Sequence, residues 1–227
     1  NLYHSLKKMP NGKDAKIGIV KNINQFDPYR RYSLMDWAVA IIINQFYNSS
    51  VINFFKNGRF KIRIPGIVWI NHYNKDAIGA MDFFGLNYYS HNHIKFKFNL
   101  KEFFELKFFK KDIMTDMPYT IYAEGFYRAL QQSASLNKPI IITENGIADK
   151  KDNRREIYIK RYLYALTIAL KEGVDIKGYY YWSLMDNFEW TFGYDMKFGL
   201  YEVDFTTQKR KLREGAKIYK KIIQLNS

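Results

Sequence analysis

The sequence predicts an α/β protein built around a parallel sheet. Across its 227 residues, stretches of strand character alternate four times with stretches of helix character, and no internal repeat, low-complexity tract or linker interrupts this order. The predicted strands are short, almost continuously apolar and separated by helices, which is typical of a parallel sheet covered on both faces. Doubly wound sheets and (β/α)8 barrels share this alternation, so the pattern alone leaves both architectures open.

The first half of the chain opens with a polar turn at 10–12 and a short apolar strand at 15–23. Apolar residues at helical spacing then predict a long helix over 33–58, which ends on a glycine. A second strand is expected at 81–90. The segment 94–117 is rich in Lys and Phe without clean periodicity, and we expect a long loop with a short helix there.

The second half of the chain continues the alternation. The predicted elements are, in order, an amphipathic helix at 120–137, a strand at 139–143, a helix at 152–173, a strand at 176–184 and a closing helix at 213–225. Asp152 is the expected N-cap of the helix at 152–173 and Gly173 its C-cap, because these residue types satisfy the free backbone groups at helix ends.

The composition excludes several classes of protein. An apolar fraction of 47% excludes an intrinsically disordered chain. The 19 Tyr, 18 Phe and 4 Trp supply rings that fill cores and also line pockets for half-apolar ligands such as sugars. The absence of cysteine excludes disulfides and thiolate chemistry, and it fits a reducing compartment such as the cytoplasm.

The net charge of +14 is interpreted as a solvated lysine-rich surface. The lysines are spread from Lys7 to Lys221, without an RNA-binding aromatic signature or a helix-turn-helix pattern, so we expect no nucleic-acid partner. No apolar run approaches the roughly 20 residues that cross a bilayer, and we expect no membrane partner. The N-terminus has no signal-peptide core and no initiator Met, which predicts a start partway through a longer protein.

Polar side chains stand at the carboxyl ends of three predicted strands. They are Asn87 and Tyr89, then Glu144, and then the segment 182–189. Loops converge at that end of a parallel sheet, and functional sites are built there. Glu144 follows a buried strand beside the turn-forming pair Asn145-Gly146. An acid at such a position can have a purely structural role, as a helix cap or as one member of an ion pair. The strand-end position favours a functional carboxylate.

The segment 178–205 combines aromatic rings with acids. It reads "GYYYWSLMDNFEWTFGYDMKFGLYEVDF", a predicted strand that continues into a polar-aromatic loop. Carbohydrate sites need this mixture, because a ring face packs on the C–H side of a sugar and carboxylates accept its hydroxyls. Tyr179 to Tyr181 are expected in the core, whereas Glu189 lies between Phe188 and Trp190 and needs a partner.

Four segments together resemble the β-glycosidases of glycoside hydrolase family 1. They are "DFFGLNYYS", "IYAEGFYRAL", "PIIITENG" and "GYYYWSLMDNFEWTFGY", in this order and spacing. The resemblance implies a (β/α)8 barrel and a retaining mechanism. It further implies that residues 1–227 are the C-terminal half of a single barrel domain, so that the four predicted strands are the fifth to the eighth, with no second domain.

The resemblance also implies roles for individual residues. Glu144 resembles the catalytic nucleophile, and Tyr89 resembles the residue whose hydroxyl orients that carboxylate. The implied substrate-binding residues are Asn87, Trp182, Glu189, Trp190 and Phe198. No metal and no cofactor is implied, and the implied small-molecule partner is a β-glycoside. The carboxylate of Glu189 would repel a phosphorylated sugar, which favours plain hexosides.

One part of the family's machinery is missing. A retaining glycosidase needs a second carboxylate as general acid/base, which this family takes from an Asn-Glu-Pro motif that does not occur in this sequence. The family's early glycone-binding Gln and His have no counterpart either. Half a barrel leaves open sheet edges, so we expect the N-terminal half as a partner, in the same longer chain or as a separate one.

Three functions therefore stay open at this point. The first is a retaining β-glycosidase whose acid/base lies outside this chain. The second is a non-catalytic glycan-binding or scaffold protein with a glycosidase-like fold. The third and weakest is a basic domain associated with nucleic acid.

Overall fold

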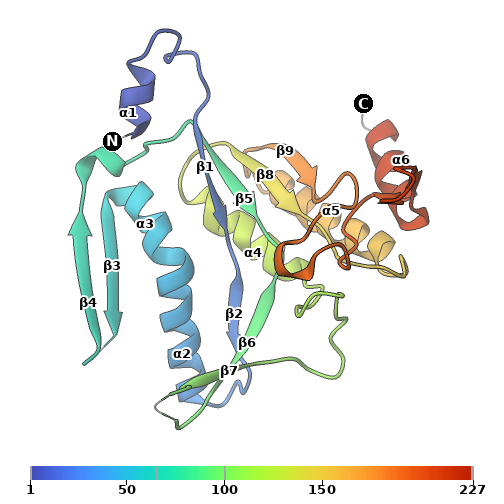
Figure 1. Cartoon of the computed structure of the whole chain (residues 1–227). Helices are drawn as coiled ribbons and strands as arrows, with labels where there is room; N and C mark the ends of the chain where they lie inside the picture. Colours follow the sequence, from blue (N-terminus) through green and yellow to red (C-terminus); the bar gives the residue numbers. More distant parts are fainter. Residues whose placement is uncertain (1, 65, 100, 226–227) are drawn as a thin grey trace.

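A four-stranded parallel sheet is the centre of the molecule. The computed structural model describes residues 2–64, 66–99 and 101–225, so both ends of the predicted 1–227 domain lie outside it (Figure 1). The strands, in spatial order, are β1 (Gly18–Asn22), β5 (Phe83–Asn87), β8 (Ile140–Asn145) and β9 (Ile176–Tyr181), and all neighbours are parallel. Each predicted strand is present.

Helices pack on one face of this sheet. They are α3 (Ser50–Asn57), α4 (Ala123–Ala134), α5 (Arg155–Lys171) and α6 (Lys217–Leu225). The helix α2 (Leu34–Asn44), which precedes α3, packs instead against β2 (Gln25–Pro28) and β6 (His91–Phe96). Figure 1 shows α4 and α5 on the same side of the sheet. Phe84 and Ile142 point to that side and pack in the buried core with Phe126 of α4 and Tyr162 of α5.

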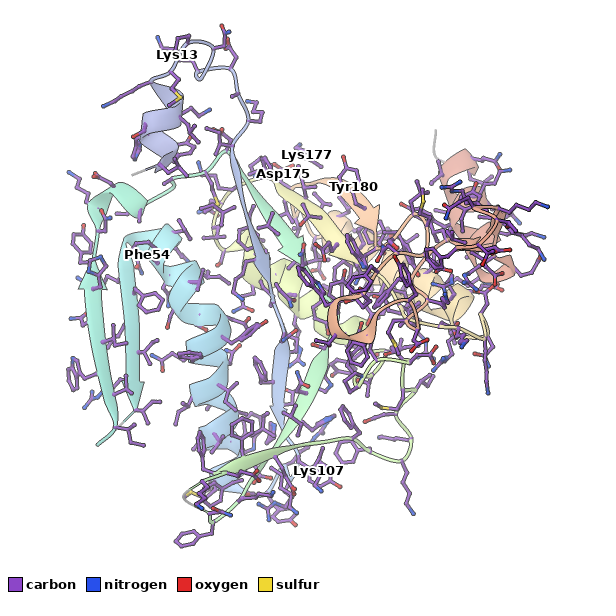
Figure 2. The ribbon with its side chains drawn as sticks, viewed as in Figure 1. Lys13, Phe54, Lys107, Asp175, Lys177 and Tyr180 are labelled. Carbon is purple, nitrogen blue, oxygen red and sulfur yellow. The ribbon has the colours of Figure 1, made fainter. Side chains whose placement is uncertain are left out.

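The opposite face of the sheet carries no helix among the described residues. On this face Val20 of β1 is 54% exposed and Tyr180 of β9, labelled in Figure 2, is 64% exposed. Helices therefore cover only one face of the sheet in the described chain. One-sided cover excludes the doubly wound sheet and fits an arc of a (β/α)8 barrel, whose strands face one another across the barrel axis. In the described chain β1 and β9 are the two edges of the arc.

The long predicted helix over 33–58 is confirmed. It comprises α2, one π-helical turn (Gln45–Ser49) and α3, and it ends at Gly58 with a φ of +76°. Ser33 caps its start by accepting the backbone N–H of Asp36. Glycine adopts this left-handed conformation without a steric penalty, which explains why the helix ends there.

The start of α5 differs from the prediction. The helix begins at Arg155, and Asp152 is not its N-cap but has a φ of +55°. The carboxylate of Asp149 accepts the backbone N–H groups of Arg154 and Arg155 at 2.8 and 2.9 Å, so this residue caps the helix from further upstream. The predicted end is confirmed, since Gly173 has a φ of +86° and closes a Schellman motif.

The segment 94–117 is not the loop with a short helix that we predicted. It contributes β6 (His91–Phe96) and β7 (Phe104–Lys107), an antiparallel pair, and none of its described residues is helical. Lys95 of β6 forms a cross-strand ion pair with Glu105 of β7 at 3.1 Å, and Lys107 pairs with the same carboxylate along β7 at 3.2 Å. A charge ladder of this kind has no apolar alternation, which is why periodicity missed it.

Three smaller units complete the chain. The strand β2 (Gln25–Pro28) extends the sheet of β6 and β7. Hairpins are formed by β3 (Arg59–Ile64) with β4 (Val68–Tyr73) and by β10 (Tyr201–Val203) with β11 (Arg210–Leu212), and α1 (Leu2–Lys7) begins the described chain. Phe54 of α3 lies against the first hairpin, 6.4 Å from the ring of Phe60 (Figure 2). No helix of the described chain is long and apolar enough to cross a bilayer.

Candidate active site

Glu144 stands at the carboxyl end of β8, where the sheet becomes irregular. The register of β8 shifts against both β5 and β9 next to this residue, and such shifts re-aim a side chain. Tyr89 follows β5, and its hydroxyl donates a 2.7 Å hydrogen bond to Oε2 of Glu144. The structure thus joins the two residues for which the resemblance implied nucleophile and orienting roles.

Asn145 and Gly146 do not form the turn that the sequence suggested. Asn145 is the last residue of β8 and is fully buried. Its amide donates to the carbonyl of Tyr88 at 2.6 Å and its Oδ1 accepts from the hydroxyl of Tyr179 at 2.8 Å. A Cβ on Gly146 would lie 1.7 Å from the carbonyl oxygen of Trp182. Both residues therefore hold β8 tightly between its neighbours, which positions Glu144.

A cavity of about 360 Å³ opens in front of this carboxylate. Its lining residues are Asn22, Tyr89, Ser90, Met117, Tyr119, Glu144, Trp182, Glu189, Trp190 and Phe198. The loop after β9 supplies the last four of these. The structure therefore brings together six of the predicted site residues from three separate segments of the chain.

Asn87 is the predicted residue that does not line the cavity. Its Oδ1 accepts a 2.6 Å hydrogen bond from Oγ1 of Thr143 on the neighbouring strand β8. The side chain of Asn87 thus links β5 to β8 at Thr143, the residue that precedes Glu144. Its contact in this structure is with the strand that carries the carboxylate.

Four lining residues were missed by the sequence analysis. Asn22 ends β1 in register with Asn87, so the strand-end rule that singled out the other strands would have found it. Its Oδ1 is buried and has no hydrogen-bond partner among the described residues. Ser90 adjoins the predicted Tyr89, whereas Met117 and Tyr119 lie in an irregular loop that carried no periodic signal.

The aromatic walls of the cavity differ in exposure. Phe198 is almost fully buried and meets the ring of Tyr89 edge to face at 6.2 Å. Trp190 is 83% exposed at the rim, and Trp182 is partly buried beside Glu144. The cavity therefore has a fixed aromatic floor and an open aromatic rim, as a site for a sugar ring requires.

Two carboxylates share this cavity, and the charge of Glu144 affects the pKa of Glu189. Burial raises the pKa of Glu189 above its ordinary value, and the nearby charge of Glu144 raises that pKa further, while a hydrogen bond with Trp182 acts in the opposite direction. Burial and the charge of Glu144 also raise the pKa of the Tyr89 hydroxyl, which therefore stays protonated as a hydrogen-bond donor. The chemistry available is that of an oriented carboxylate facing an aromatic pocket.

The other acidic residues that we considered have structural contacts. Glu105 takes part in the β6–β7 ion pairs, and Glu102 pairs with Lys97 at 3.3 Å. Asp186 accepts from Arg213 at 2.7 Å and from the backbone N–H of Gly199, so it holds the loop after β9. No group of three or more side chains able to hold a metal ion occurs in the described ranges.

Comparisons with known proteins match nearly the whole chain. The family model described as glycosyl hydrolase family 1 matches residues 3–227. β-Glucosidase A of Thermotoga maritima is 34% identical over 236 residues, which cover 94% of this chain and 52% of that protein. The 6-phospho-β-galactosidase of Leptotrichia buccalis is 29% identical over 256 residues, which cover 93% of this chain and 55% of that protein.

Solved structures agree with these relatives. The family 1 β-glucosidase from Thermotoga maritima superposes with a TM-score of 0.83 at 28% identity, covering 99% of this chain and 54% of that chain. The chain spans about half the length of the curated relatives it matches. The (β/α)8 architecture predicted from the resemblance is confirmed, as part of a barrel, and the chain belongs to glycosyl hydrolase family 1.

Proposed function

We propose that this chain supplies the nucleophile half of a retaining β-glycosidase. The observation that carries the proposal is the 2.7 Å hydrogen bond from Tyr89 to Glu144, at the strand end that faces Trp182 and Phe198. A bond of this kind orients a carboxylate and leaves its second oxygen for attack. A protein that only binds sugars has no need of it.

The reaction would follow the two steps of a retaining glycosidase. Oε1 of Glu144 attacks the anomeric carbon while the glycosidic bond breaks, and the leaving oxygen takes a proton from a general acid. The same group then removes a proton from water, whose oxygen displaces Glu144 from the anomeric carbon. Two carboxyl groups about 5 Å apart are required for this sequence.

The general acid/base comes from outside these 227 residues in our proposal. The sequence contains no Asn-Glu-Pro motif, and the cavity's other carboxylate, Glu189, is the residue implied to bind sugar hydroxyls. The N-terminal half of the barrel would supply the missing acid and would pair with the edges of β1 and β9. The absence of cysteine supports a reducing, cytoplasmic setting for the assembled enzyme.

The substrate in this proposal is a non-phosphorylated hexoside. Glu189 lies in the cavity with a second carboxylate, and a phosphate dianion placed beside them would be repelled. The alternative is a 6-phospho-hexoside, since a 6-phospho-β-galactosidase is among the relatives. Cations would have to line the cavity for that substrate, and none of the lining residues is Lys or Arg.

The decisive experiment uses the protein that joins this chain to the N-terminal half of its barrel. Hydrolysis of 4-nitrophenyl β-D-glucoside should fall by about 10⁴-fold or more in Glu144→Gln, because the nucleophile is lost. Azide, as an external nucleophile, should restore turnover in Glu144→Gly. Glu156→Gln, an exposed acid on α5, is the matched control and should keep full activity. Undiminished hydrolysis in Glu144→Gln would refute the proposal.

The same protein tests the substrate class. The value of kcat/KM for the glucoside should exceed that for its 6-phosphate, and Glu189→Gln should narrow the difference by removing the repelling charge. A preference for the phosphorylated substrate would contradict this part of the proposal while leaving the nucleophile assignment intact.

A glycan-binding protein without catalysis is the second candidate. The missing Asn-Glu-Pro motif favours it. Binding of glucose-like ligands that quenches tryptophan fluorescence, together with no turnover in the joined protein, would select this candidate over the enzyme.

A further inference from the structure

Two consecutive arginines occupy the start of α5, where cations are electrostatically unfavourable. The N-terminus of a helix carries a partial positive charge, so Arg154 and Arg155 are placed against the helix dipole. Arg155 is in addition fully buried, and burying a guanidinium is costly unless each of its donors finds an acceptor. The contacts that these two side chains make must offset that cost.

Arg155 joins the loop after Glu144 to the loop that carries Phe198. Its Nη1 donates to the carbonyls of Ile147 and Phe198, each at 3.1 Å. Its Nη2 donates to the carbonyls of Asp149 and Lys197, each at 3.0 Å.

The remaining contacts of the Arg155 guanidinium are made to side chains. Nε pairs with Asp152 at 2.8 Å, and Nη1 also donates to the hydroxyl of Tyr181 at 2.8 Å. The donors on all three nitrogens therefore find acceptors, and most of these are carbonyls of loops that border the cavity.

Arg154 reaches a different loop. Its Nη1 donates to the carbonyl of Met114 at 2.6 Å, and its Nη2 contacts the carboxylates of Asp116 and Asp149. The backbone N–H of Asp116 in turn bonds to the carbonyl of Ala148. Arg154 therefore ties the segment that leads into Met117 and Tyr119 to the same turn that Arg155 holds.

These contacts connect three walls of the cavity at one helix end. Glu144 precedes the turn at 147–149, Phe198 lies in the second loop, and Met117 with Tyr119 belongs to the third. No residue of α5 lines the cavity itself. The arginines touch the walls only through backbone carbonyls and through acids outside the cavity, which is the arrangement of positioning residues.

We propose that Arg154 and Arg155 are positioning residues of the active site, each for a different wall. Arg155 fixes the distance between Glu144 and the cavity wall that contains Phe198. Arg154 fixes the position of the wall formed by Met117 and Tyr119. The proposal rests on the proposed function for its kinetic consequence, since a displacement of about 1 Å at a reacting centre can cost about 100-fold in rate. Lysine cannot replace either residue, because a point ammonium lacks the planar fork of five donors.

The test compares Arg154→Lys and Arg155→Lys in the protein that contains both barrel halves. Arg161→Lys, an exposed residue on the same helix, is the matched control. Hydrogen exchange by mass spectrometry should show faster exchange at 114–119 in Arg154→Lys and at 146–149 and 196–199 in Arg155→Lys. The helix α5 should keep its protection in both variants. For the aryl glucoside, kcat/KM should fall about 10- to 100-fold in each and stay unchanged in the control.

A second variant covers the case in which Arg155→Lys does not fold. Tyr181→Phe removes one acceptor of Arg155, so exchange at 146–149 and 196–199 should rise by a smaller amount. Exchange that rises evenly over the sheet and helices would overturn the proposal. So would exchange at 196–199 that rises in Arg154→Lys, or exchange at 114–119 that rises in Arg155→Lys, because only the turn at 147–149 is held by both arginines. The exchange readout needs no turnover, so an inactive parent protein would refute the proposed function and still decide this inference.

Discussion

The hydroxyl of Tyr89 donates a 2.7 Å hydrogen bond to Oε2 of Glu144 across 55 residues of sequence. The two side chains come from the ends of the adjacent parallel strands β5 and β8, so the sheet itself sets their separation. Burial and the charge of Glu144 raise the pKa of the Tyr89 hydroxyl far above neutral pH, so the hydroxyl keeps its proton there. Tyr89 therefore serves as a permanent donor.

Removing this donor should slow the reaction without abolishing it. In Tyr89→Phe of the joined protein we expect kcat to fall about 10- to 100-fold, because the carboxylate is still present but no longer held in one orientation. KM should change little, since the phenyl ring remains in place. Steady-state kinetics on an aryl glucoside measure this. Tyr164→Phe, on the exposed face of α5, is the control, and an equal loss of kcat there would contradict the role of Tyr89.

Gly146 should tolerate no side chain. A Cβ at this position would lie 1.7 Å from the carbonyl oxygen of Trp182, so Gly146→Ala must push β8 and β9 apart. We expect this substitution to lower the free energy of unfolding by about 3 kcal/mol, as overpacking does. Urea denaturation of this chain measures the change. In Gly178→Ala, where the nearest atom lies 3.7 Å away, stability should be kept, and equal losses in both variants would contradict the steric argument.

The ion pair of Asp186 and Arg213 should be costly to break. Its N···O distance is 2.7 Å and both side chains are almost fully buried. In Arg213→Met the Asp186 carboxylate would keep only backbone donors, and we expect a loss of about 3–5 kcal/mol in the free energy of unfolding. Lys217→Met removes an exposed pair with Glu214 and should change stability by less than about 1 kcal/mol. Similar denaturation midpoints for the two variants would refute this expectation.

His93 should make the fold sensitive to acid. Burial lowers the pKa of His93 to about 4, and the neighbouring His91 lowers it as well, while Asp112 and Asp27 act in the opposite direction and Arg31 lowers it slightly. The pKa of a histidine in the unfolded chain is about 6.5. Between about pH 4 and pH 6.5 the unfolded state therefore binds more protons than the folded state. The stability that is present above about pH 6.5 is lost as the pH falls towards about 4.

The measurement compares the wild-type chain with His93→Gln. Between pH 7 and pH 4.5 the wild type should lose on the order of 1–2 kcal/mol more in its free energy of unfolding than the variant, after solvent screening of the half-buried ring. His72→Gln, an exposed histidine on β4, should follow the wild-type curve. If wild type and His93→Gln showed parallel curves, His93 would not be the group that titrates.

The strand and helix positions were predictable because they depend on local patterns. The apolar run at 139–143 places β8, and helical spacing over 33–58 places α2 and α3. The same run delivers Glu144 to the functional end of the sheet. Where local pattern was absent, the prediction was wrong, as in the β6–β7 pair, whose cross-strand ion pair joins Lys95 to Glu105 ten positions further on.

The site was predictable only in part. A strand-end rule and the family motifs identified six of the residues that line the cavity, because each stands in a recognisable segment. Asn22 was within reach of the same rule. Met117 and Tyr119 were not, since they lie in an irregular loop that Arg154 contacts from 38 to 40 residues downstream.

The sequence by itself determined the four strands of the parallel sheet, the long helices between them and the position of Glu144 at the end of a buried strand, because burial and backbone propensity act over a few neighbouring positions. Only the tertiary structure decided that helices cover one face of the sheet, that Asp149 caps α5, and that Asn145 and Gly146 lock β8 between its neighbours. These features depend on contacts between segments far apart in the chain, and no local pattern encodes the distance between two such segments.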